Sequence, residues 1–65
     1  MNLDQAKLLS AACEFVYQAF NQKITDNLAT DHEKRQYNTN DLLTARYLVS
    51  DIQRTYTDYI NNFSD

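Results

Sequence analysis

The chain has 65 residues, of which 43% are hydrophobic and 23% are charged, and its net charge is -3. These proportions are typical of a globular protein, and the acidic excess argues against nucleic acid or an anionic membrane as the partner. The longest run without strongly polar residues, Leu8–Cys13, is far too short to span a bilayer. Residues 1–5 lack the basic and apolar parts of a secretion signal. We therefore expect a soluble, cytoplasmic protein.

The sequence contains neither glycine nor proline. Tight turns between strands favour glycine or asparagine at positive φ, whereas helix interiors disfavour both missing residues, so an all-α fold is predicted. Cys13 is the single cysteine and His32 the single histidine. An internal disulfide is therefore excluded, and no metal site or cofactor is expected. Small chains without these supports usually gain stability by association.

Residues 3–28 are predicted to form the first helix, with Asn2 as its N-cap. At 100° per residue its apolar side chains cover an arc of roughly 200°, whereas packing against one neighbour needs only a little more than about 100°. Ser10 and Asn21 belong to the remaining polar arc. Two apolar stripes with three- and four-residue spacing make up the wide arc, which predicts two neighbouring helices. The first stripe is Ala6, Leu9, Cys13, Val16 and Phe20, and the second is Leu8, Ala12, Phe15 and Ala19.

Residues 29–40 form the predicted connection. Thr30 and Glu33 have the spacing of a capping box, so a short helical turn or third helix is expected here. The alternative is that the first helix continues into this segment. Asn38 and Asn40 are expected to adopt the left-handed backbone conformations that glycine would otherwise provide.

The second helix is predicted to begin within residues 39–41 and to end near Phe63. Its apolar residues keep three- and four-residue spacing, as in a coiled coil, and form a stripe roughly 120° wide. Arg46, Gln53 and Arg54 are expected on the opposite, polar face. The stripe consists of Leu42, Ala45, Val49, Ile52, Tyr56, Tyr59 and Phe63, with Leu48 and Ile60 at its edges.

The second helix can cover only one of the two stripes on the first. We therefore predict a single domain, residues 1–65, that is an antiparallel two-helix hairpin and assembles as a four-helix-bundle homodimer. Burying a large apolar side chain contributes about 1.5–3 kcal/mol, which is large beside the roughly 3–5 kcal/mol that one small core supplies. The predicted dimer interface is Leu8, Ala12, Phe15, Ala19 and Phe20.

Leu43, Arg46, Tyr47 and Arg54 are the candidate binding residues of the second helix. Exposed leucine, tyrosine and arginine are residue types that anchor protein interfaces. The alternative for Leu43 and Tyr47 is packing under the connection or against the second subunit. Arg46 and Arg54 would also suit the phosphate groups of a nucleotide-like anion.

No set of residues has the pattern of an active site. The chain has no glycine for a phosphate-binding loop, and Asp51, Arg54 and Asp58 fit a solvated ion-pair ladder. We predict a non-enzymatic protein that binds a partner protein stoichiometrically, as an inhibitor, adaptor or regulator. The small size and the many Asn, Thr and Asp residues suit a phage or mobile-element accessory protein.

Two other functions remain open. One is a homo-oligomer that encloses a nucleotide-like anionic molecule. The other is RNA binding by a hairpin dimer, because the predicted architecture resembles the plasmid Rop-type RNA-binding proteins in size and two-helix design.

Overall fold

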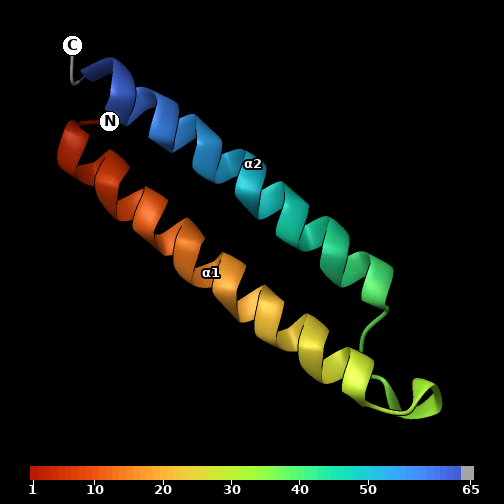
Figure 1. Cartoon of the computed structure of the whole chain (residues 1–65). Coiled ribbons are helices and arrows are strands. Elements are labelled where there is room, and N and C mark those ends of the chain that lie inside the picture. The colour runs from red at the N-terminus through yellow and green to blue at the C-terminus, as the bar shows by residue number, and fades with distance from the viewer. Residues whose placement is uncertain (64–65) are drawn as a thin grey trace.

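The computed structural model describes residues 1–63. They form two long helices, α1 (Leu3–Ala29) and α2 (Thr39–Phe63), joined by a segment that contains the 3-10 helix η1 (His32–Lys34). The two helices run antiparallel, so the start of α1 lies beside the end of α2 (Figure 1). The all-α hairpin and the short turn in its connection are therefore confirmed. No helix in the described part of the chain is long and apolar enough to cross a membrane.

The start of α1 is held by a capping box. The Asn2 side chain accepts a hydrogen bond from the Gln5 amide at 2.8 Å, and the Gln5 side chain accepts one from the Asn2 amide at 3.1 Å. The predicted cap is therefore confirmed, because two amides that the helix leaves without internal partners are satisfied. At the other end, the Arg35 guanidinium donates to the carbonyls of Thr30 and Leu28. These bonds tie the connection to the last turn of α1.

Two predictions about the connection are wrong. The Thr30 hydroxyl donates to the Asp26 carbonyl instead of capping the next turn, and no side chain caps η1. No described residue has a positive φ, so Asn38 and Asn40 do not adopt left-handed conformations. The Asn38 side chain instead accepts from the Asn40 amide, and its carbonyl accepts from the Leu42 amide. Asn38 therefore acts as the N-cap of α2, one residue before the predicted range.

The buried and half-buried residues of the two helices form one stripe on each, which we call the interhelix stripes. Both keep three- and four-residue spacing, and both include polar residues that were expected in solvent. Ser10 and Asn21 of α1, and Arg46 and Gln53 of α2, were assigned to polar faces, and this assignment is wrong. The α1 stripe is Leu3, Ala6, Ser10, Cys13, Tyr17, Phe20, Ile24 and Asn27, with Asn21 half-buried at its edge, and the α2 stripe is Thr39, Leu42, Arg46, Val49, Gln53, Tyr56 and Ile60, with Ala45 and Tyr59 half-buried at its edge.

Hydrogen bonds between the helices explain why the sides on which they meet include polar residues. The Gln53 side chain donates to the Ser10 carbonyl at 3.2 Å, and Arg46 donates to the Asn21 side chain at 2.7 Å. Ile52 and Phe63, expected in the stripe of the second helix, are in consequence about half exposed.

The hairpin buries little apolar surface. The buried hydrophobic residues of the described chain are Ala6, Ile24 and Leu42, and none of its large side chains is fully buried. Cys13, expected in the core, is half-buried. At the open end of the hairpin, opposite the connection, the Tyr59 hydroxyl donates a hydrogen bond to the Met1 carbonyl. This core is thin for a chain of 65 residues.

Candidate functional site

An apolar surface runs along one side of the hairpin, which we call the apolar face. Phe15 and Leu8 are its most exposed members, with 81% and 71% of their surface accessible. Residues on the surface of a small protein are rarely gathered into such a continuous apolar area without a partner. The face consists of Leu8, Leu9, Ala12, Phe15, Val16 and Ala19 of α1 with Leu48 and Ile52 of α2.

A groove shows that the two helices contribute to the same side of the molecule. It has a volume of about 180 Å³, and its lining is almost wholly apolar. The groove is lined by Leu9, Ala12, Cys13 and Val16 of α1 and by Val49, Ile52 and Tyr56 of α2. A second apolar hollow, bounded by Met1, Gln5, Leu8 and Leu9, lies at the N-terminal end of the face.

The residues predicted for the dimer interface are placed as follows. Leu8, Ala12, Phe15 and Ala19 are all exposed on the apolar face, whereas Phe20 is half-buried and belongs to the interhelix stripe. Leu9 and Val16 were expected to pack against the second helix. They are instead partly exposed and line the groove, because α2 packs against Ser10 and Tyr17.

Arg46, one of the candidate binding residues, is used inside the hairpin. Its guanidinium lies 5.7 Å from the centroid of the Tyr17 ring, in addition to its bond with Asn21. A cation over an aromatic face is attracted by the ring quadrupole. These contacts leave Arg46 poorly placed to hold an external phosphate group.

A second polar contact lies nearer the open end. Gln53 donates to a Glu14 carboxylate oxygen at 3.2 Å, and Gln18 donates to the other oxygen at 2.9 Å. The hydrogen bonds from Gln18 and then Gln53 hold the pKa of Glu14 below its usual value of 4.5, because both stabilise the charged carboxylate.

The remaining candidate binding residues form a patch on α2, which we call the outer patch: Leu43, Tyr47 and Arg54. Spacings of four and seven residues place them on one side of the helix. Tyr47 is 69% exposed, and the Leu43 side chain beside it is also accessible. At 100° per residue, Tyr47 lies roughly 100–140° around α2 from Leu48 and Ile52. The outer patch is therefore separate from the apolar face.

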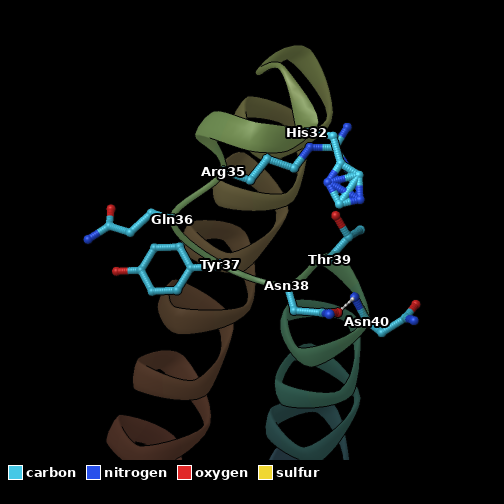
Figure 2. A pocket seen from close by; sticks show the side chains of 7 residues that line it. All are labelled: His32, Arg35, Gln36, Tyr37, Asn38, Thr39 and Asn40. Carbon is cyan, nitrogen blue, oxygen red and sulfur yellow. Dashed lines mark hydrogen bonds between the residues drawn. The ribbon is translucent and has the colours of Figure 1, made fainter.

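A cavity of about 390 Å³ lies at the connection. Figure 2 shows that its side chains do not converge, because Gln36 and Tyr37 point away from His32 and Thr39. Arg35, the guanidinium in this lining, already binds carbonyls at the end of α1. These contacts hold the connection together and define no ligand site.

The fold and its surfaces define an α-helical hairpin with an unpaired apolar face. Comparison of the chain with protein-family models, curated proteins and solved structures yields no match. In the 63 residues described, no three His, Cys, Asp or Glu side chains are grouped so that they could hold a metal ion. The apolar face and the outer patch are therefore the surfaces from which a function is argued.

Proposed function

We propose that this chain is a small non-catalytic binding protein that works as a homodimer and associates stoichiometrically with a partner protein. The exposed apolar face, centred on Leu8 and Phe15, is the observation that carries the proposal. Pairing two such faces encloses both in one four-helix bundle. The outer patch then remains in solvent on each subunit and is the surface offered to the partner.

The energetics favour pairing. Each large apolar side chain moved from water into an interface contributes about 1.5–3 kcal/mol when fully buried. Leu8 and Phe15 are among the most exposed hydrophobic residues of the described chain. Burying both in an interface therefore adds the free energy of two large apolar side chains to a hairpin whose own buried residues include only three hydrophobic ones among those described.

The outer patch suits a protein partner. Tyrosine and arginine are over-represented among residues that dominate binding energies, and leucine supplies apolar contact beside them. Tyr47 and Leu43 are exposed on one side of α2, and the Arg54 side chain is exposed further along the same side. This arrangement presents a ring, an aliphatic side chain and a cation in a row.

The mass of the particle in solution tests the dimer. Light scattering should give twice the 7.6 kDa of one chain. Phe15→Asp should reduce the mass to that of one chain or unfold it, because a charge in the interface loses its hydration. Tyr47→Asp introduces the same charge on the other side of the hairpin and should leave the mass unchanged. A wild-type particle of single-chain mass, or a Phe15→Asp dimer, contradicts the proposal.

The partner is tested by reconstitution. A protein that copurifies with the chain should form a complex of fixed stoichiometry when both are mixed in purified form. Tyr47→Ala and Arg54→Ala should weaken this complex without changing the dimer mass, whereas Lys34→Ala, which removes an exposed cation of the connection, serves as the control. A ligand that binds only the folded chain adds RT ln(1 + [L]/Kd) to the free energy of unfolding and so raises the melting temperature. If nucleotides have this effect and no protein complex forms, the chain sequesters a small molecule and the proposal is wrong.

A further inference from the structure

We infer that the apolar face is covered by a second copy of this chain whose α1 runs antiparallel to the first, with Leu8 opposite Ala19 and Ala12 opposite Phe15. The inference rests on the proposed homodimer and adds its orientation and register. A two-fold axis makes every contact reciprocal, so a residue pair in an antiparallel dimer shares one midpoint along the helix. Both pairs have their midpoint between Cys13 and Glu14.

Side-chain size favours this register. In both pairs a large side chain of one copy lies opposite an alanine of the other, so Leu8 and Phe15 enter the spaces that Ala19 and Ala12 leave. All four residues are exposed on α1. A parallel arrangement would place Leu8 against Leu8 and Phe15 against Phe15, with alanine against alanine between them. Protein interiors are packed as densely as crystals of small molecules. A parallel dimer is therefore disfavoured, because its large side chains would overlap and its alanines would leave voids.

Charge at the edge of the face agrees with the same register. Asp4 and Lys23 are exposed, and their midpoint also lies between Cys13 and Glu14. The antiparallel dimer therefore brings each Asp4 level with Lys23 of the second copy, whereas a parallel dimer brings Lys23 level with Lys23. An exposed pair of this kind adds little affinity, but it distinguishes the two orientations.

The second helix has exposed apolar side chains near the level of this axis. Gln53 contacts Ser10 and Glu14, and Arg46 contacts Tyr17 and Asn21. The level between Cys13 and Glu14 therefore falls between Arg46 and Gln53 of α2. Leu48 and Ile52 are exposed in that interval, whereas Val49 is half-buried.

The length of the hairpin allows a second copy to lie along the whole apolar face. Specific interfaces bury on the order of 800 Å² per partner. The hairpin extends 51 × 15 × 15 Å, and the apolar face occupies the part of one long side between Leu8 and Ala19, so polar residues around the face share in an interface of this size. A second hairpin of equal length can cover the face from end to end.

Disulfide trapping tests the orientation. In a Cys13→Ser background, Leu8→Cys and Ala19→Cys are prepared as separate chains, unfolded in urea, refolded alone or together, and oxidised. Residues 8 and 19 of one helix are about 16 Å apart at 1.5 Å per residue, and a disulfide needs Cα atoms within about 7 Å. We expect a linked dimer only when the two chains are mixed. Leu8→Cys mixed with Gln18→Cys is the control and should stay unlinked.

Each outcome is informative. A single-chain mass for the Cys13→Ser parent and the wild type overturns both the proposed dimer and this inference. A dimer in which Leu8→Cys links to itself is parallel, and overturns the orientation alone. A dimer that forms no mixed disulfide has another register or another interface, and likewise overturns the inference while the homodimer stands.

Discussion

The guanidinium of Arg46 lies over the ring of Tyr17, 5.7 Å from its centroid, in the contact between the two helices. The same guanidinium donates a hydrogen bond of 2.7 Å to the Asn21 side chain. A residue type usually found in solvent thus joins α2 to α1 near the middle of the hairpin. The aromatic ring and the side-chain oxygen of Asn21 together hold the guanidinium in place.

Replacing Arg46 should destabilise the fold although no apolar core residue is changed. Arg46→Ala removes the cation from Tyr17 and the donor from Asn21, and we expect unfolding to become easier by about 1–2 kcal/mol. Arg46→Lys should recover only part of this, because lysine lacks the planar, forked donor. Urea denaturation at fixed chain concentration measures the effect. Arg54→Ala, which removes an exposed arginine of the same helix, should change stability by less than about 0.5 kcal/mol.

Asn27 provides a second test at the connection end. It is 7% exposed, and its side-chain amide donates to the Thr39 hydroxyl at 2.8 Å. Asn27→Ala leaves Thr39 without this donor and opens space, so we expect a loss of about 1–3 kcal/mol. The double variant Asn27→Leu with Thr39→Val removes both polar groups and should be more stable than Asn27→Ala. If the double variant is the less stable of the two, the hydrogen bond is not what the single variant loses.

Acid should weaken the contact between Glu14 and Gln53. The pKa of Glu14 is lowered in the folded chain by hydrogen bonds from Gln18 and Gln53, so folding favours its charged form. The resulting stability is present above the unfolded pKa and is lost as the pH falls through the lower, folded pKa. Urea midpoints between pH 7 and pH 3 should therefore fall less for Glu14→Gln than for the wild type. Equal slopes would show that Glu14 makes no contribution. Glu33→Gln, in the connection, is the matched control.

Local sequence patterns determine the helices of this protein. The absence of glycine and proline, the cap at Asn2 and the long three- and four-residue spacing favour helix over short distances, and both helices appear close to their predicted bounds. The apolar arc of the first helix also predicts a surface that one neighbour cannot cover. Leu8 and Phe15 are accordingly exposed in the hairpin.

The tertiary structure decided which face of each helix meets the other. Hydrophobicity alone assigned Leu9 and Val16 to the contact, and Arg46 and Gln53 to solvent. Their actual places depend on bonds between residues far apart in the chain, such as Gln53 to Ser10 and Arg46 to Asn21. Helical periodicity describes one helix at a time and cannot show that a polar side chain will find its partner on another. Only the packed hairpin selects the rotation that satisfies these groups and leaves the apolar face open.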